Sequence, residues 1–384
     1  MRIAVVAGPY IPVPPLAYGG TEAIIHHQIN GLKEAGHTPI LLGPGDSTAE
    51  CEVIPTCEQS IYFPLSRKNL KQHQKLVEGI NRQTKKQLSR LVSSIDIIHS
   101  HGFDLSSFSD FPGITTIHGP IDLNGLGYYL KRRKLLYVTV SKNQQEALPL
   151  LNYIGTVYNG EDPRKFTLVQ QPDDYVSFLG RFDREKNPHL AIQLAISLGI
   201  KIKLAGKIDY QAEGYFDEAI RPYLKHPLVE FLGEIGFKEK IELLSHARCN
   251  LHPTGFREPF GLDVLEAAYC GTPTLAIDRG SMPELIEDGR TGILVEDFVE
   301  GYHQIEQCFA MDRKYISTRA KTLFNYTNMT AGYIEIYNRI LRAYPERTMT
   351  RHTAWRRLPQ IQTQLGLTPP IRQEALSSAK KPVA

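Results

Sequence analysis

The sequence predicts an α/β protein built from two Rossmann-like, doubly wound domains. Short apolar, β-branched segments alternate with helical patterns along most of the chain. The apolar segments are continuous, which indicates parallel strands covered on both faces. The alternation of strand and helix patterns recurs in both halves of the chain. About a dozen strands over roughly 340 residues fit two such domains better than one eight-stranded barrel.

Each half contains six expected strands. In the first half they are Arg2–Ala7, Thr38–Leu42, Asp96–Ser100, Gly113–Ile117, Leu135–Val140 and Ile154–Tyr158. In the second half they are Tyr175–Leu179, Lys201–Ala205, Val229–Leu232, Asn250–His252, Thr274–Ile277 and Gly292–Val295. Helical patterns fill the intervals, such as Thr21–Ala35 with Gly36 as its C-terminal stop.

A polar, proline-bounded stretch, Pro163–Asp174, indicates the break between domains. We therefore expect an N-terminal domain at residues 1–168 and a C-terminal domain at residues 169–328. Residues 329–345 contain an amphipathic helix, and residues 346–384 form a basic, loosely ordered tail rich in proline.

Composition excludes several classes of protein. With 42% apolar and 22% charged residues among 384, the chain is neither disordered nor collagenous, and no run of 18 apolar residues predicts a membrane span. The first apolar run reads as a strand rather than a signal peptide. Five scattered cysteines without CxxC spacing indicate reduced thiols, so we expect a cytoplasmic protein.

The net charge of +3 is distributed unevenly. Ser66–Arg90 carries +7 and Arg347–Ala384 carries +6, which leaves a net −10 on the remainder. An acidic body with two basic segments lacks the even positive surface of a nucleic-acid binder, so we expect no nucleic-acid partner.

Ligands of open parallel sheets bind beyond the carboxyl ends of the strands, and four segments occupy such positions. The first is Ala17–Glu22, where Gly19-Gly20 opens a helix. Paired glycines let backbone approach a ligand, and a helix N-terminus attracts anions. The segment lacks the GxGxxG pattern of dinucleotide sites. The alternative is a plain loop with Thr21 as helix cap.

The second segment is Leu179–Pro188, where a strand ends and a helix begins at Pro188 with Asn187 as its cap. Arg181 and Lys186 are then held near the end of the strand. A forked guanidinium beside a compact ammonium suits a diphosphate. The alternative is two solvated surface cations.

The third segment is Glu258–Ala268, in which Gly261 starts a helix. The free N–H groups of Phe260, Gly261 and Leu262 would point into the cleft. Glu258 and Glu266 lie eight residues apart, so they would project to one side if the whole segment were helical, and carboxylates suit sugar hydroxyls. The alternative is an acid at a helix terminus and an exposed mid-helix glutamate.

The fourth segment, Thr115–Gly119, places His118 at the end of a strand, in a cleft position. A single histidine there is otherwise a partly buried structural residue. Together the four segments predict a shared cleft, with a glycine turn and an imidazole from one half and Arg181, Lys186 and two glutamates from the other.

This ordered set resembles the retaining family 4 glycosyltransferases of the two-domain GT-B fold, which include sucrose-phosphate synthases and bacterial polysaccharide and lipid glycosyltransferases. The resemblance runs from Arg2 to about Tyr344. It rests on Gly19–Glu22, His118-Gly119, Val140-Ser141, Val157–Asp162, Leu179–Arg181, Glu185–Asn187, Glu258–Leu262, Glu266-Ala267 and Cys270–Pro273.

The resemblance implies a role for each candidate residue. Arg181 and Lys186 would hold the donor diphosphate, with Gly19 and Gly20 beside the phosphates. Glu266 would bind the nucleotide ribose. The transferred sugar would be held by Glu258 and by the amides of Phe260, Gly261 and Leu262, with His118 over it near the reacting carbon.

The resemblance also implies the reaction and the partners. A sugar would pass from a nucleotide-sugar, with a UDP-sugar expected first and a GDP-sugar second, to an unidentified carbohydrate, lipid-linked or small-molecule acceptor, with retention at the anomeric carbon. The N-terminal domain would take the acceptor, the C-terminal domain the donor, and the last helix would cross back onto the first domain. No Asp-x-Asp motif occurs, so we expect neither metal nor cofactor, with cations neutralising the leaving group.

Other functions remain open at this stage. An epimerase or a phosphorylase can use the same fold, and a non-catalytic sugar-nucleotide sensor would keep only the binding. A sensor needs neither both glutamates nor both cations, which favours the transferase.

The basic segment Ser66–Arg90 reads as a helix whose core face contains Leu70, Leu76, Val77, Ile80 and Leu88. A second basic, aromatic cluster spans Tyr128–Lys134. Such surfaces can rest on an anionic membrane, which would place the protein peripherally on its inner face. The alternative is a solvated helix face.

Overall fold

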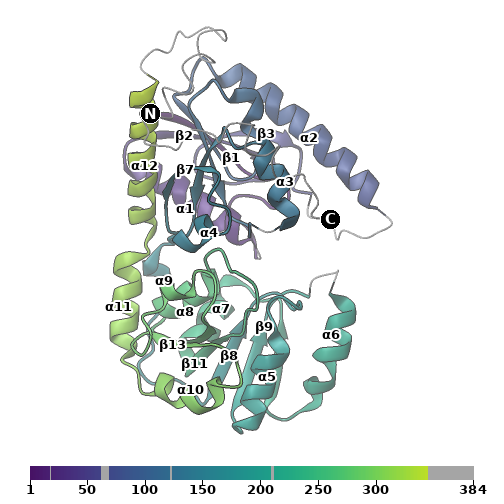
Figure 1. Cartoon of the computed structure of the whole chain (residues 1–384), viewed down its shortest axis with the longest axis vertical. Helices are drawn as coiled ribbons and strands as arrows, with labels where there is room; N and C mark the ends of the chain where they lie inside the picture. The colour runs from purple at the N-terminus through teal and green to yellow at the C-terminus, as the bar shows by residue number, and fades with distance from the viewer. Residues whose placement is uncertain (18, 62–68, 122, 209–211, 345–384) are drawn as a thin grey trace, which may run out of the picture.

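The computed structural model describes residues 1–17, 19–61, 69–121, 123–208 and 212–344. Tyr18, residues 66–68 of the basic segment and the tail at 346–384 lie outside the described residues. Two parallel sheets, each covered by helices on both faces, lie one above the other in Figure 1. The predicted pair of doubly wound domains is therefore confirmed.

The first sheet has seven parallel strands in the order β3-β2-β1-β4-β5-β6-β7. Their bounds are β1 Arg2–Val6, β2 Thr38–Pro44, β3 Glu52–Cys57, β4 Ile97–Ser100, β5 Gly113–Ile117, β6 Leu136–Thr139 and β7 Asn152–Thr156. Six of them match predicted segments to within two residues. The sequence pattern missed β3, because this edge strand is only half-buried and contains Pro55, which makes it unlike a buried parallel strand.

The helices of this domain are α1 Gly20–Glu34, α2 Leu70–Leu91, α3 Leu123–Lys131 and α4 Lys142–Glu146, with a 3₁₀ turn, η1, at Leu105–Phe108. The core face expected for α2 is partly wrong. His73, Ile80, Thr84 and Leu88 are buried, whereas Leu70 and Leu76 are 46% and 39% exposed. The buried residues form one stripe at helical spacing, and Leu76 lies off that stripe.

The second sheet has six parallel strands in the order β10-β9-β8-β11-β12-β13. They are β8 Tyr175–Leu179, β9 Lys201–Ala205, β10 Val229–Gly233, β11 Cys249–His252, β12 Thr274–Ile277 and β13 Gly292–Val295. Its connecting helices are α5 Pro188–Ser197, α6 Glu213–Ala219, α7 Phe237–His246, α8 Leu262–Tyr269, α9 Met282–Leu285 and α10 Gly301–Phe309. Two 3₁₀ turns, η2 Pro163–Lys165 and η3 Arg221–Lys225, complete the connections.

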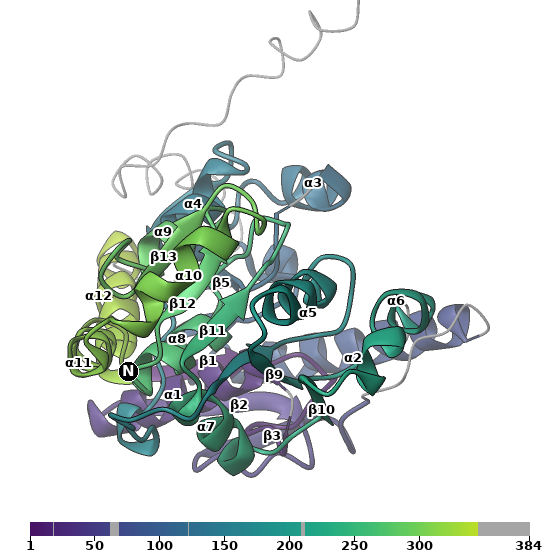
Figure 2. The same ribbon diagram turned by 90° about the horizontal axis from the view of Figure 1, so that it is seen from below.

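The two faces of the second sheet bury different helices. Residues of α5 and α10 share one apolar cluster with the strands, and these helices lie nearest the viewer when the molecule is seen from below (Figure 2). Residues of α7 and α8 belong to another cluster, on the face directed toward the first domain in Figure 1. The loop that precedes α8 therefore lies near the junction of the domains.

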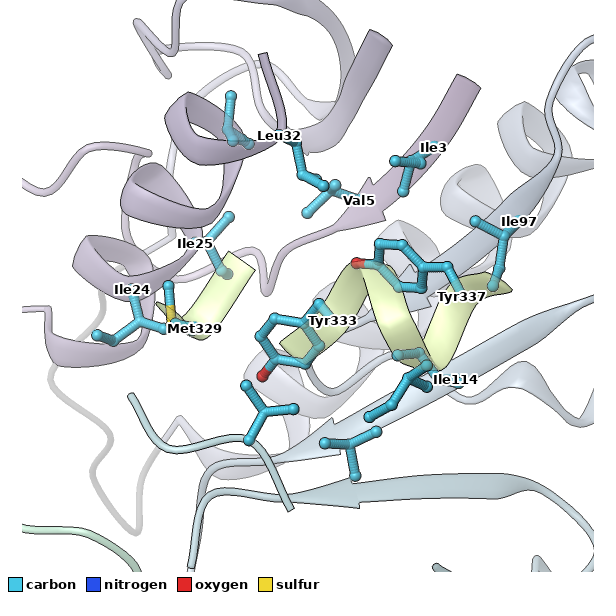
Figure 3. Packing of buried hydrophobic residues seen from close by; sticks show 14 of the residues in the cluster. Ile3, Val5, Ile24, Ile25, Leu32, Ile97, Ile114, Met329, Tyr333 and Tyr337 are labelled. Atoms are coloured by element: carbon cyan, nitrogen blue, oxygen red, sulfur yellow. The ribbon is translucent and has the colours of Figure 1, made fainter. Parts of the chain in front are cut away.

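After α11 (Arg313–Leu323), the chain returns to the first domain through α12 (Tyr326–Ala343). Asn325 caps α12, because its side chain accepts a hydrogen bond from the amide of Asn328. Tyr333 and Tyr337 are fully buried against β1, β4 and β5, and Met329 packs beside Ile24 of α1 (Figure 3). The predicted crossing of the last helix is therefore confirmed, and α12 completes the core of the first domain.

Candidate active site

The β8–α5 connection holds both predicted cations. The Lys186 ammonium lies 2.6 Å from Glu258 Oε2, and both side chains are largely buried. Arg181, one-third exposed, pairs with Asp183 at 3.1 Å and Glu185 at 3.6 Å. Burial opposes the charge on Lys186, but Glu258 and Asp263 outweigh it and raise the pKa of Lys186, while Arg181 opposes them. The structure thus brings Arg181, Lys186 and Glu258 together.

Asn187 differs from the expectation in one detail. It precedes α5, as predicted, but its backbone is left-handed (φ 49°) and its side chain does not cap the helix. The side-chain amide instead donates to the carbonyl of Pro253, at 3.1 Å. This bond ties the cation-bearing loop to the segment that leads to Glu258.

Sequence reasoning missed a buried, hydrogen-bonded His–Asp pair beside these groups. Asp263, in the first turn of α8, lies 2.7 Å from His252 at the end of β11. Burial opposes the charge of Asp263, but His252 and Lys186 stabilise it and lower the pKa of Asp263 to about 2. Asp263 is therefore a fixed anion next to Lys186. A polar pair spanning a strand end and the following helix N-terminus was the available signal.

The helix α8 begins at Leu262, with Gly261 in a left-handed conformation (φ 89°) before it. Phe260 is 3% exposed and packs against Tyr158 and Phe324, so only its backbone can face a ligand. Glu258 lies in a loop rather than a helix, which means that the shared helical face expected for Glu258 and Glu266 is wrong.

Glu266 is buried in a cluster of charged groups. Its carboxylate is paired with Lys240 of α7 and hydrogen bonded to the buried Glu161. Burial, reinforced by Glu161, raises the pKa of Glu266 to about 8, while Lys240 opposes the shift. Burial also acts on Glu161, but His27 and Lys240 outweigh it and lower the pKa of Glu161. Burial and the neighbouring carboxyl group therefore disfavour full ionisation of the Glu266–Glu161 pair.

The glycine turn of the first domain meets the α8 N-terminus directly. The helix α1 begins at Gly20, preceded by Gly19 as N-cap, so Thr21 lies inside the first turn. A Cβ added to Gly20 would lie 2.9 Å from Leu262 Cδ1, which only a glycine avoids without displacing Leu262. The structure therefore brings Gly19 and Gly20 to the element that carries Gly261 and Leu262.

His118 lies immediately after β5, and its Nε2 is 2.8 Å from His101 Nδ1. Burial lowers the pKa of His118 to about 4, so the ring is neutral near pH 7. His101 was not predicted as a site residue. The signal was present in His99-Ser100-His101, because residues two apart at the end of a strand project to the same side.

The helix α4 connects His118 to the second domain. The Gln144 side-chain amide donates to the carbonyls of Ile117 and Gly119, at 3.0 and 2.7 Å, on both sides of His118. Arg257, next to Glu258, donates to Asn143 Oδ1 at 3.0 Å. The segment carrying Glu258 and the loop carrying His118 are thus held by the same short helix.

Glu284 of α9 supplies a second connection to α4. Its two carboxylate oxygens accept hydrogen bonds from the backbone amides of Lys142 and Asn143, both at 2.8 Å. The Tyr158 hydroxyl donates to the same carboxylate at 2.7 Å. An acid of one domain therefore caps a helix of the other, which sequence patterns alone do not reveal.

Two comparisons of sequence decide the family. The model described as Glycosyltransferase Family 4 matches residues 18–155, and the model described as Glycosyl transferases group 1 matches residues 161–307. The chain belongs to the family 4 glycosyltransferases. The two matches divide this glycosyltransferase between its sheets, at the segment that links β7 to β8.

Relatives and solved structures agree with this family. The glycosyltransferase is 25% identical over 347 residues to a protein named glycogen synthase from Mycobacterium tuberculosis, covering 76% of this chain and 82% of the relative. It is 24% identical to an uncharacterised glycosyltransferase of Methanocaldococcus jannaschii, covering 88% and 98%.

Among solved structures, the sucrose-phosphate synthase of Thermosynechococcus elongatus superposes with a TM-score of 0.71 at 18% identity, covering 89% of this chain and 99% of that one. Anabaena HepE in complex with UDP-glucose superposes with a TM-score of 0.68 at 16% identity, covering 88% and 99%. These likenesses identify the fold.

The part of the chain that the structure describes, residues 1–344 apart from its gaps, contains neither of two further features. No group of three or more His, Cys, Asp or Glu side chains is arranged to hold a metal ion there. Within the same residues, no helix combines the length and the apolar character needed to cross a bilayer.

Proposed function

We propose that this glycosyltransferase moves a sugar from a nucleotide-sugar donor, a UDP-sugar in the first instance, to an acceptor hydroxyl with retention of anomeric configuration. The observation that carries the proposal is the buried Lys186–Glu258 pair beside Arg181. It lies next to the α8 N-terminus, which faces Gly20 of the other domain.

The cations support departure of a nucleoside diphosphate. In the structure Lys186 is paired with Glu258, and Arg181 with Asp183 and Glu185. A bound diphosphate would draw both cations toward its oxygens and neutralise the charge that develops as the sugar–phosphate bond breaks. The amides at the start of α8 add hydrogen-bond donors for the same anion.

The carboxyl groups have separate tasks in this proposal. Glu258, released in part by Lys186, accepts hydrogen bonds from hydroxyls of the transferred sugar. Glu266 binds the ribose after exchanging part of its contact with Lys240. The carboxyl oxygens of Glu266 would accept hydrogen bonds from the ribose hydroxyls.

Retention follows if the leaving diphosphate removes the proton of the acceptor hydroxyl on the same face of the sugar. We propose that this proceeds without a metal or cofactor, because Arg181 and Lys186 already supply the positive charge. Neutral His118 then lies beside the sugar as a hydrogen-bonding group rather than a cation.

The names of the relatives support this donor and suggest a carbohydrate acceptor. HepE was solved with UDP-glucose, and the catalytic domain of Arabidopsis thaliana starch synthase IV, with a TM-score of 0.64 at 14% identity, was solved with ADP and acarbose. Their bound nucleotides make UDP and ADP the first two to test, followed by GDP.

The test begins with the nucleotide. UDP, ADP and GDP are compared for their effect on melting temperature, since a ligand at 100 times its Kd stabilises the folded state by about 2.7 kcal/mol. Nucleotide release from the matching sugar-nucleotides is then measured for the wild type and for Arg181→Ala and Glu258→Ala. We expect losses of at least about 100-fold, as for removal of one transition-state donor. Unchanged turnover in both variants would overturn the site assignment.

The matched control is Arg184→Ala, because Arg184 is in the same loop but is exposed and pairs only weakly with Glu218, at 3.6 Å. It should keep turnover within about twofold. Product NMR with an α-linked donor distinguishes retention from inversion, and conversion without acceptor would indicate an epimerase. Activity that survives EDTA supports the absence of a metal, whereas loss restored by one divalent cation would contradict it.

Contact with an anionic membrane stays a proposal of its own. Exposed Leu70 and Leu76 lie among Lys71 and Lys75 on α2, which supports it. On α3, however, the Arg132 guanidinium lies over one face of the Tyr128 ring and is itself 2.7 Å from Asp104. Flotation with anionic and with neutral vesicles tests the contact. Binding only to anionic vesicles, reduced by Lys71→Glu/Lys75→Glu, supports it, and equal behaviour with both contradicts it.

A further inference from the structure

His118 is the outer end of a continuous row of buried polar side chains. The rings of His118 and His101 are stacked with centroids 5.1 Å apart, and those of His101 and His99 with centroids 4.2 Å apart. His99 is fully buried and His101 is 7% exposed. Three neutral imidazoles therefore extend from the end of β5 into the core of the first domain, where α12 closes over them.

Gln28 of α1 lies at the centre of this row and fixes its direction. Its Oε1 is 2.8 Å from His101 Nε2, and its Nε2 is 2.6 Å from His99 Nδ1 and 2.9 Å from the Tyr337 hydroxyl. An amide oxygen can only accept and an amide nitrogen can only donate. With this orientation, His101 carries its proton on Nε2 and His99 accepts at Nδ1.

The inner end of the row is consistent with that direction. His99 Nε2 is 2.7 Å from Thr116 Oγ1, to which it donates, and Thr116 is 3.1 Å from the Tyr333 hydroxyl. The Tyr337 hydroxyl, 2.6 Å from His99 Nδ1, is able to donate to that nitrogen. Every group thus finds a partner of the opposite kind, which buried polar groups require.

The outer end follows from that orientation of the Gln28 amide. Because His101 Nε2 carries the proton, His101 Nδ1 is an acceptor, and His118 Nε2 must donate to it across 2.8 Å. We infer that Gln28 and His101 are positioning residues that hold His118 in its Nε2-protonated tautomer, with Nδ1 presented as a hydrogen-bond acceptor for a hydroxyl of the donor sugar. The part about the sugar rests on the proposed function.

Burial strengthens the arrangement. It lowers the pKa of His99 and His101 well below the usual range, and each imidazole further disfavours charge on its neighbours. A proton taken up at His118 would have no carboxylate in the row to balance it. The row therefore favours a neutral acceptor over an imidazolium donor at the site.

The decisive measurement is the tautomer of His118 in the ligand-free protein, read from ¹⁵N ring shifts and assigned by loss of its signals in His118→Gln. We expect an Nε2 proton and an unprotonated Nδ1 from pH 8 down to pH 6. An Nδ1-protonated or positively charged ring in the wild type would overturn the inference. This reading needs no substrate, so it stands or falls independently of the proposed function.

Variants test the positioning role. His101→Leu removes the acceptor, so His118 should populate both tautomers and kcat should fall about 10- to 100-fold, as for partners that orient a ligand-binding histidine, while the donor KM changes less than about threefold. His101→Asn offers an amide oxygen close to where Nδ1 was and should restore the tautomer and most of kcat. An unaltered tautomer and kcat in His101→Leu would contradict the role.

The matched control is His26→Gln. His26 is on the same helix as Gln28, burial lowers its pKa to about 4 as well, and it bonds to Asn30 rather than to the row. It should leave the tautomer of His118 and kcat unchanged. If His101→Leu does not fold, the tautomer of His118 in the wild type and in His101→Asn still tests the inference. A fixed Nε2 proton on His118 in both proteins supports it, and the absence of that proton in either contradicts it.

Discussion

Lys186→Met tests whether the central ion pair stabilises the fold as well as serving the site. The substitution leaves the Glu258 carboxylate, whose side chain is 14% exposed, without its cation at 2.6 Å. Breaking a buried ion pair costs about 3–5 kcal/mol. Because both side chains keep some exposure, we take the lower end, about 3 kcal/mol. For a domain of this size that lowers the melting temperature by roughly 6–12 °C.

Glu258→Gln should cost less, about 1–2 kcal/mol, because Lys186 keeps the nearby charge of Asp263. In the double variant neither charge remains, so its loss of stability should be smaller than the sum of the single losses by about 2 kcal/mol. Turnover should not recover, since both groups serve the donor. The double variant would then be more stable than the sum of the single losses predicts, yet it would stay as inactive as the single variants.

Thermal denaturation followed by circular dichroism measures the stability of each variant, and nucleotide release measures its turnover. Lys201→Met is the control, because Lys201 forms an equally short pair with Glu230 in which both side chains are about 40% exposed. Exposed pairs contribute at most about 1 kcal/mol. Losses at Lys186 and Glu258 that add to within about 0.5 kcal/mol would refute the reasoning.

Three further outcomes follow from the structure. Gly31→Ala should lower stability by about 1–3 kcal/mol, because its Cβ would lie 2.1 Å from Thr330 Oγ1 on α12. Adding Thr330→Gly to this variant should partly restore the melting temperature. An unchanged melting temperature in Gly31→Ala would argue against this helix contact. Glu284→Ala should lower stability by about 1–3 kcal/mol by leaving the α4 amides unpaired. Glu284→Gln, which keeps one acceptor oxygen, should lower it by less, and equal losses in the two variants would contradict a contribution from that oxygen. The free energy of unfolding should also fall as pH drops from 6.5 toward 4, by up to about 1.4 kcal/mol per pH unit for each histidine of the row. The reason is that burial lowers the pKa of these histidines in the folded state, so the unfolded chain binds the extra protons. The fall of stability with pH should be shallower in His118→Gln, and a melting temperature that stays constant between pH 7 and 5 would contradict the lowered pKa values.

Strands in the middle of each sheet were predictable from the sequence because burial on both faces leaves a continuous apolar run. Thr274–Ile277 and Tyr175–Leu179 match their observed bounds for this reason. The edge strand β3 carries a weaker pattern and was missed. Exposure of Leu76 on α2 was also not predictable, because helical spacing alone does not say which of two adjacent stripes meets the sheet.

The candidate residues themselves were identifiable from local signals such as a strand end or a helix start. Partners such as Lys240 and Glu284 were not, because they reach the site through tertiary packing rather than through spacing in the sequence. The raised pKa of Glu266 has the same origin, since the fold buries this side chain and places Glu161 beside it. Sequence thus located the site, and the fold determined its charge states.

The position of α12 has a consequence for the order of biosynthesis. Met329, Tyr333 and Tyr337 fill the centre of a domain whose first strand begins at Arg2. When the first 320 residues have left the ribosome, every strand of both sheets has been synthesised. The N-terminal domain still lacks α12, the helix that packs on its apolar face. The N-terminal domain is therefore synthesised first but completes its core last. Until α12 is made, the apolar face that it covers is exposed and is a surface that chaperones can bind.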